Sequence, residues 1–192
     1  MRRTLLEAGI AMARQGGPDA VVLREATRQA GVAPNAAYRH FASQQDLLLA
    51  VRGHALSAAA AMMEAELATV PTELAPVDAA RAGLRSVGRA YLRFAHAEPG
   101  LFHTAFAVQG SAGAAMAENS VPNPFTLLGA ALDRFVAVGI LPPARRAGAE
   151  YLAWSAVHGL ALLVTDGPLF SMAAAEREAI GERLLDMVEK GL

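Results

Sequence analysis

The sequence of 192 residues contains no cysteine, and this absence excludes several kinds of chemistry. Disulfides, zinc–thiolate sites and thiol nucleophiles all need cysteine, and a chain without any fits a reducing cytosol. Charged residues make up only 18% of the chain and hydrophobic residues 54%, which is the reverse of a disordered composition. The sequence therefore predicts one compact folded body, with enough length for a small attached module.

The sequence also lacks a long hydrophobic run. Glu7 interrupts the apolar residues that follow Arg2 and Arg3, so this end does not match the hydrophobic region of a signal peptide. The uncharged stretch 151–165 falls short of the roughly 20 apolar residues that a membrane-spanning helix needs. We therefore expect a cytoplasmic protein that does not insert into a membrane.

Alanine, in contrast, is abundant, with 44 of the 192 residues. It is the strongest helix former, and nearly every segment between glycine and proline residues repeats its apolar residues with the helical period. No run alternates apolar and polar residues as a half-buried strand would. The pattern predicts an all-α chain of about nine helices, near residues 3–15, 22–30, 34–40, 44–69, 77–97, 101–108, 124–138, 144–166 and 173–190.

Charge is distributed unevenly along the chain. Residues 1–54 hold seven arginines and four acidic residues, a net charge of +3. Residues 55–192 hold ten basic and fourteen acidic residues, a net charge of −4. A basic N-terminal quarter on an acidic remainder indicates a module that faces nucleic acid.

Two of the predicted helices, 22–30 and 34–40, are joined by a connection of the length found in a helix-turn-helix. Gly31 in this connection tolerates the positive φ that the turn needs, and Val32 can fill the corner between the helices. In such a unit the second helix enters the major groove and presents its N-terminal residues to base edges. Ser43 is then expected to cap the helix that follows.

The stretch from Leu23 to Leu49 strongly resembles the tetracycline-repressor (TetR) family. The resemblance lies in the Ala-Gly-Val turn at 30–32, the Tyr-x-His-Phe run at 38–41 and the capped Leu-Leu pair at 47–48. The run Trp-x-x-x-His-Gly at 154–159 resembles the signature of one C-terminal class of that family. The resemblance implies a three-helix DNA-binding head with a helix-turn-helix in residues 1–50. It implies a helical domain for effector binding and dimerisation in residues 51–192.

The resemblance also implies which residues meet double-stranded operator DNA. Residues 34–37 occupy positions that face bases or the groove, and Tyr38 and His40 match positions that commonly contact phosphates. For Tyr38 and Phe41 the alternative is a place in the hydrophobic core, and for the two arginines of the first motif helix it is a solvated face. The full set of expected DNA contacts is Arg24, Arg28, Pro34, Asn35, Ala36, Ala37, Tyr38, Arg39, His40 and Gln44.

Three positions depart from the family pattern. Ala33 stands where a serine or threonine often caps the second motif helix, Ala36 replaces a frequent threonine, and Gln44 replaces a phosphate-binding lysine. Each departure removes a hydrogen bond or a charge. Asn35 is then the side chain best suited to adenine, because its amide can make two hydrogen bonds to that base.

Aromatic residues concentrate in the second half of the chain. Most would fill a core, but a helical chamber among them would suit an apolar ligand, with two histidines supplying polar contacts. Repressors of the resembling family are usually released by small effectors, so the resemblance implies a small apolar effector, and no cofactor is expected. The expected lining is Phe94, Phe102, His103, Phe106, Met116, Phe125, Trp154 and His158.

The last two long helices are more apolar than the surface of a monomer should be. Burial within one subunit is one explanation, and a two-fold homodimer interface is the one that the resemblance favours. The residues expected at that interface are Leu152, Ala153, Ala156, Leu160, Leu163, Leu184 and Val188.

Other features indicate no chemistry. Four arginines recur every fourth residue from Arg81 to Arg93, either as an anion-binding ridge or, as we expect, as a solvated face. His96 and His103 flank a helix break, so no metal site is expected. The sequence has no nucleophile elbow, phosphate-binding loop or paired carboxylates, so no catalytic residue and no enzyme activity are expected.

Together these features predict a TetR-like dimeric transcriptional regulator, a repressor whose DNA affinity is controlled by an effector. Two alternatives stay open. One is a helical protein that binds a lipid or small molecule, or an enzyme, whose DNA-binding head is vestigial. The other is a DNA-binding protein that acts constitutively and binds no ligand.

Overall fold

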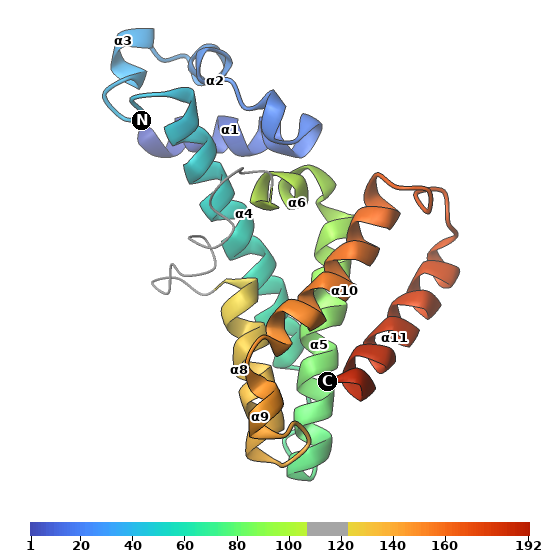
Figure 1. Ribbon diagram of the computed structural model, residues 1–192. Helices are drawn as coiled ribbons and strands as arrows, with labels where there is room; N and C mark the ends of the chain where they lie inside the picture. The colour runs from blue at the N-terminus through green and yellow to red at the C-terminus, as the bar shows by residue number, and fades with distance from the viewer. Residues whose placement is uncertain (107–122) are drawn as a thin grey trace. The chain divides into compact units, whose positions relative to one another are not determined.

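The structure, a computed structural model, describes residues 1–106 and 123–192, apart from the side chain of Pro34. In that part of the chain every regular element is helical, so the all-α prediction is confirmed (Figure 1). The elements are α1 (Arg2–Gly16), the 3-10 helix η1 (Pro18–Ala20), α2 (Leu23–Gln29), α3 (Pro34–Ala37), α4 (Gln44–Leu67), α5 (Pro76–Ala97), α6 (Pro99–Phe106), α8 (Pro124–Ala137), α9 (Pro143–Arg146), α10 (Ala149–Thr165) and α11 (Ala174–Gly191).

Contacts divide the chain into two compact units. The head unit comprises Met1–Ala58 and α6, and the body unit comprises Ala59–Ala97 with α8 to α11. α4 contributes its first part to the head and its last turns to the body. This division by contacts differs from the functional division near residue 50, which stays a prediction.

The head unit is held together around α1. The apolar residues of α1 pack with α2, α6 and η1. At Gly9 a Cβ atom would lie 2.8 Å from a methyl group of Val51, so only glycine lets α1 and α4 approach this closely. At Gly100 a Cβ atom would overlap with the backbone carbonyl of Ala13, so α6 packs directly on the last turn of α1. Arg14 and Glu98 add an ion pair of 3.1 Å across the same contact.

The body unit is arranged around α5, which contacts α8, α10 and α11. The buried stripe of α5 contains Leu84, Val87, Tyr91 and Phe94, as the helical period predicts. Asn123 caps α8 by accepting hydrogen bonds from the amides of residues 125 and 126, each at 3.0 Å. The stripe defines the buried face of α5, and the cap defines the first residue of α8.

One predicted helix is divided in two. The sequence predicts a continuous helix over 144–166, but Gly148 adopts a left-handed conformation with φ of 79° and separates α9 from α10. Arg146 in α9 then bonds the carboxylate of Asp133 at 2.7 Å and that of Glu150 at 2.7 Å. The break therefore lets a short basic segment pair with carboxylates of α8 and α10.

α4 is the described helix that is long and apolar enough, by length and composition alone, to cross a membrane. Its apolar residues Leu47, Val51, Ala55 and Met63 are buried within the fold. Arg52, in the middle of α4, donates to the Ala105 carbonyl at 2.8 Å. One face of α4 is therefore packed against the rest of the protein.

Candidate nucleic-acid interface and aromatic cluster

The turn between α2 and α3 has the geometry that the sequence predicts. Gly31 has a positive φ of 63°, and its amide donates to the Arg28 carbonyl at 3.3 Å. The amide of Val32 donates to the Thr27 carbonyl at 2.9 Å, which completes a Schellman cap on α2. The carbonyls at the end of α2 are thereby satisfied by backbone, and the chain turns directly into α3.

α3 is shorter than predicted, because regular helix ends at Ala37 and does not reach His40. The amides of His40 and Phe41 both donate to the Ala37 carbonyl, at 2.8 and 3.0 Å, so these residues form a tight turn. Phe41 is buried, and the need to place its ring in the head core draws the chain away from the helix axis. The core alternative therefore holds for Phe41.

Seven of the ten expected DNA contacts lie on the surface of the head unit. Ala36 is half-buried, and the side chain of Pro34 lies outside the described residues. Tyr38 is 56% exposed, so the core alternative does not hold for it. Ala37 is fully buried and belongs to the head core, so its side chain offers no surface to a groove. The exposed residues are Arg24, Arg28, Asn35, Tyr38, Arg39, His40 and Gln44.

The two arginines of α2 have different surroundings. Arg28 makes a two-bond contact with the carboxylate of Glu25, at 2.6 and 2.9 Å, whereas Arg24 forms no ion pair within the described residues. The hydrogen bond from Arg28, helped by one from Gln29, lowers the pKa of Glu25 to about 2, so this carboxylate is ionised at every working pH. Part of the positive charge of Arg28 is therefore balanced within α2.

The start of α4 is capped as predicted. The Ser43 hydroxyl oxygen accepts a hydrogen bond from the amide of Asp46 at 3.1 Å. Gln44 is the first residue of α4 and is exposed. A helix start whose amides face outward can bind a phosphate, and the amide side chain of Gln44 can add a hydrogen bond there without adding charge.

In the body unit, a cluster of aromatic side chains joins α5, α8 and α10. Trp154 and His158 lie one turn apart on α10 with ring centroids 4.9 Å apart. Phe125 of α8 meets Trp154 edge-on at 6.4 Å and lies 5.7 Å from Tyr151. We call Tyr91, Phe125, Tyr151, Trp154 and His158 the aromatic cluster.

Hydrogen bonds order the polar atoms of the aromatic cluster. The indole N–H of Trp154 donates to the Tyr91 hydroxyl oxygen at 3.2 Å, and this hydroxyl lies 2.8 Å from Nδ1 of His158. Because an indole can only donate, the Tyr91 hydroxyl oxygen is the acceptor in the bond with Trp154, while the donor in the bond between this hydroxyl and Nδ1 depends on the tautomer of His158. Burial raises the pKa of Tyr91, so its hydroxyl stays protonated.

The predicted effector residues fall in both units. Phe125, Trp154 and His158 come together in the aromatic cluster, and Phe94 is buried in the body core. In the head unit, Phe102 lies 5.6 Å from His103 and 5.3 Å from Phe106. Met116 lies outside the described residues.

Tyr91 is missing from the predicted effector set, although it bonds both polar groups of the cluster. The sequence carries a signal for it, because a tyrosine on the buried stripe of a helix needs a partner for its hydroxyl. Trp154 and His158, four residues apart on one helix, are suitable partners.

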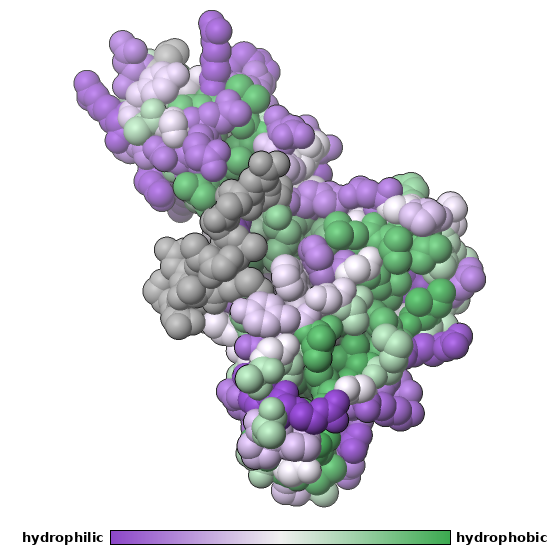
Figure 2. Space-filling model, viewed as in Figure 1, coloured by the Kyte–Doolittle hydropathy of each residue, from purple (hydrophilic) through white to green (hydrophobic). Residues whose placement is uncertain are grey.

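The predicted dimer residues divide between surface and core. Leu152 is 68% exposed and Leu163 is 43% exposed, while Ala156, Leu184 and Val188 are half-buried. Ala153 and Leu160 are buried inside the single chain and therefore offer no surface to a partner. Figure 2 shows hydrophobic residues gathered over α10 and α11, and further large apolar side chains exposed on these helices and the segment between them are Tyr151, Leu162, Phe170 and Met187.

Comparison with protein families explains the two units. Residues 5–51 match the model of bacterial regulatory proteins of the tetR family, and residues 84–188 match that of the tetracyclin repressor-like C-terminal domain. The chain belongs to the tetR family. It is a DNA-binding transcriptional regulator with a helix-turn-helix, and this family is not a family of enzymes.

Solved structures share the fold of this tetR-family regulator. A protein of unknown function from Rhodococcus sp. RHA1 has a TM-score of 0.77 at 23% identity, with 100% of this chain and 94% of that chain covered. A tetR-family transcription regulator from Marinobacter aquaeolei VT8 has a TM-score of 0.65 at 18% identity, with coverages of 96% and 93%. A putative regulator of the same family from Shewanella sp. PV-4 has 0.64 at 19%, with coverages of 97% and 96%. Comparison with curated proteins gave no match.

Within the described residues of the regulator, no three histidine, aspartate or glutamate side chains are close enough to hold a metal ion. Nε2 of His96 is 2.9 Å from a guanidinium nitrogen of Arg177, and His103 lies beside Phe102 in the head unit. The two histidines considered as metal ligands therefore have separate surroundings.

The pairing of Arg28 with Glu25 yields a test of the DNA surface. Glu25→Gln removes a charge that repels phosphate and frees Arg28, so we expect the affinity for DNA to rise severalfold, with a smaller gain at higher salt. The measurement is a mobility shift with a duplex that the wild-type protein selects from a random pool. Asp19→Asn, an equal charge change at an exposed residue of η1, is the control. An equal rise in DNA affinity in both variants would mean that the net charge of the head, and not the release of Arg28, determines the affinity.

Proposed function

We propose that this regulator is a homodimeric cytoplasmic repressor that binds double-stranded operator DNA and is released by a small apolar effector. The observation that carries the proposal is the combination of parts in one chain. An exposed polar segment follows a capped helix-turn-helix, and a separate unit holds aromatic rings with few polar groups among them. The helix-turn-helix segment suits contact with DNA, and the aromatic unit suits an apolar ligand that regulates DNA binding.

The DNA side of the proposal rests on the exposed residues after Gly31. Asn35 is exposed on α3, where its amide can bond N6 and N7 of adenine. Tyr38 and His40 follow in the tight turn, and both can donate to phosphate oxygens. Base preference in this head therefore depends on Asn35, and the neighbouring side chains position it.

The effector side rests on the aromatic cluster. Rings from α8 and α10 provide apolar contact area, and the ordered bonds among Tyr91, Trp154 and His158 give the cluster a defined polar end. Sites for small apolar ligands have this composition, with a few placed polar groups that fix orientation.

The homodimer rests on the exposed apolar residues of α10 and α11. A leucine such as Leu152, exposed by two thirds on a helix, loses contact with water when the same face of a second copy covers it. Two-fold pairing is the commonest oligomer, and it brings two recognition helices to successive major grooves, about 34–36 Å apart.

Asn35→Ala should relax base preference without removing DNA binding. Loss of a two-bond adenine contact costs about 1–3 kcal/mol of discrimination at one base pair, whereas His40→Ala should weaken all sequences alike. Selection from a random DNA pool, followed by affinity measurements on single-base variants, checks both. Unchanged preference in Asn35→Ala would show that another residue makes the base contact.

Trp154 is the one tryptophan of the chain, so its fluorescence reports on the aromatic cluster alone. Small apolar compounds that bind the cluster should change this fluorescence and lower the affinity for the selected duplex. Phe125→Ala should remove both effects. Leu74→Ala, which truncates an exposed apolar side chain between α4 and α5, should keep them. Compounds that bind beside Trp154 and leave DNA affinity intact would favour the constitutive alternative.

Leu152→Asp should split the dimer, because pairing would bury an uncompensated charge at the interface. We expect a folded monomer in sedimentation and a DNA affinity reduced at least tenfold, since one head alone makes half the contacts. Ala130→Asp, an exposed position on α8, should remain a dimer. A stable Leu152→Asp dimer would place the interface on another face. The same substitution at Leu160 would not test the interface, because this side chain is buried within the chain and a charge there would disturb folding.

A further inference from the structure

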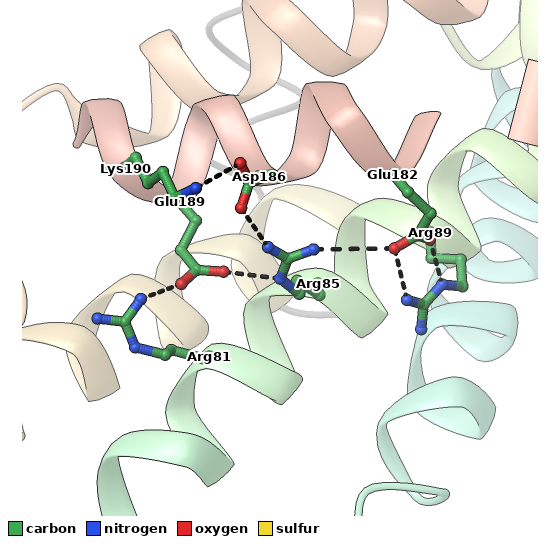
Figure 3. A network of polar contacts seen from close by, with 7 residues as sticks. All are labelled: Arg81, Arg85, Arg89, Glu182, Asp186, Glu189 and Lys190. Atoms are coloured by element: carbon green, nitrogen blue, oxygen red, sulfur yellow. Dashed lines mark hydrogen bonds and ion pairs between the residues drawn. The ribbon is translucent and has the colours of Figure 1, made fainter. Parts of the chain in front are cut away.

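The four arginines of α5 face carboxylates and do not form an open ridge. Figure 3 shows Arg81, Arg85 and Arg89 in a row opposite α11. Arg85 bonds Glu189 at 2.7 Å and Asp186 at 2.9 Å, and Arg81 also bonds Glu189. We call these contacts, with Arg89, Arg93 and their partners, the arginine ladder. The expected solvated face holds for Arg89 and Arg93, which are exposed, but Arg81 and Arg85 are half-buried, and all four arginines are paired with carboxylates.

The arginine ladder adds ion pairs to the apolar packing between α11 and α5. The buried residues of α11 are Gly181, Leu185 and Glu189, so Leu185 is the one large apolar side chain buried on this helix, and Ile180, Leu184 and Val188 are half-buried. The side chain of Glu189 is only 5% exposed, and two guanidinium groups compensate its charge. A buried carboxylate is tolerated only with such partners, so the ladder fixes the position of α11 along α5.

The arginine ladder also extends to the end of α4. Arg93 bonds Glu66 of α4 at 2.7 Å, and Nη1 of Arg89 lies 3.7 Å from the same carboxylate. Arg89 uses Nε and Nη2 for a two-bond contact with Glu182 of α11, at 2.7 and 2.9 Å. Arg85 also faces Glu182, at 3.8 Å. Among the described residues, Arg89 is the arginine with ion pairs to both α4 and α11.

The two contacts of Arg89 use different nitrogens of one guanidinium. Nε and Nη2 form the edge that meets Glu182, while Nη1 faces Glu66. Because the guanidinium is planar and rigid, a rotation that follows one carboxylate changes the distance to the other. The two helices therefore share one group whose orientation depends on both.

We propose that Arg89 is a positioning residue that couples α4 to α11, so that DNA bound by the helices at the start of α4 alters the stability of α11. This coupling goes beyond the proposed function and lies within one chain, so it does not require the homodimer. Coupling free energies are reciprocal, so the state of α11 then also changes the affinity of the head for DNA.

The test measures hydrogen exchange in α11 with and without the duplex selected by the wild-type protein. Binding restrains α4, so amides in residues 174–191 of the wild type should exchange at least threefold more slowly with DNA bound. Sedimentation first establishes a protein concentration at which the oligomeric state is the same with and without DNA. At that concentration, a difference in exchange between the free and the DNA-bound protein cannot come from a change in subunit association.

Two variants break the link from opposite sides. Glu66→Gln removes the carboxylate of α4, and Glu182→Gln removes that of α11. In both we expect DNA binding to persist while α11 exchanges at the same rate with and without DNA. Asp186→Asn removes a ladder contact that does not involve Arg89, and Arg134→Gln changes an exposed arginine of α8. Both controls should keep the slowing.

Three results would contradict the proposal, and the first two would overturn it outright. The first is a wild type in which bound DNA leaves exchange in α11 unchanged. The second is a Glu66→Gln variant in which bound DNA slows exchange in α11 as much as in the wild type. This result would overturn the proposal even if Glu182→Gln failed to fold. If the ladder only stabilises the fold, Glu182→Gln and Asp186→Asn should change the DNA-induced slowing of exchange in α11 to the same extent. Loss of the slowing in both variants would therefore contradict a specific role for Arg89.

Discussion

The body of this regulator depends on α5 finding different partners on two sides of one helix. Its buried stripe packs against α8 and α10, and its arginines meet the carboxylates of α11 and α4. Alanine-rich helices bury little apolar area per residue, so a few large side chains must provide much of the contact. Where those side chains are scarce, as between α5 and α11, ion pairs with a buried carboxylate fix the helix position.

Local signals in the sequence were sufficient to predict much of the fold. The turn at Gly31, the cap at Ser43 and the start of α8 at Asn123 each depend on atoms within five residues, so the sequence contains the whole interaction. The resemblance to the family adds the order of the helices. Of the head residues that the resemblance implies as DNA contacts, seven are exposed, Ala36 is half-buried and Ala37 is buried, while the DNA contacts themselves stay a prediction.

Interactions between distant residues could not be predicted in this way. Arg85 and Glu189 are 104 residues apart, and nothing in the spacing of the arginines identifies the helix that they face. The same applies to Leu160, whose apolar character fits a subunit interface and a core equally well until its neighbours are known. Tyr91 is intermediate, since its place on the buried stripe is predictable but its partners on α10 are not.

The arginine ladder changes how the charge of the chain relates to DNA. The arginines of α5 are balanced by acids, so they add little positive field, and Arg28 is balanced by Glu25. In the described head, Arg2, Arg24 and Arg39 are exposed and form no ion pair, and the departures at Ala36 and Gln44 remove a hydroxyl group and a charge. One head therefore offers few charge contacts to the phosphate backbone, which carries most nonspecific affinity. In the homodimer that we propose, binding of one head raises the effective concentration of the second head at the DNA and so strengthens such weak contacts. The modest charge of one head is therefore a physical argument for the proposed pairing.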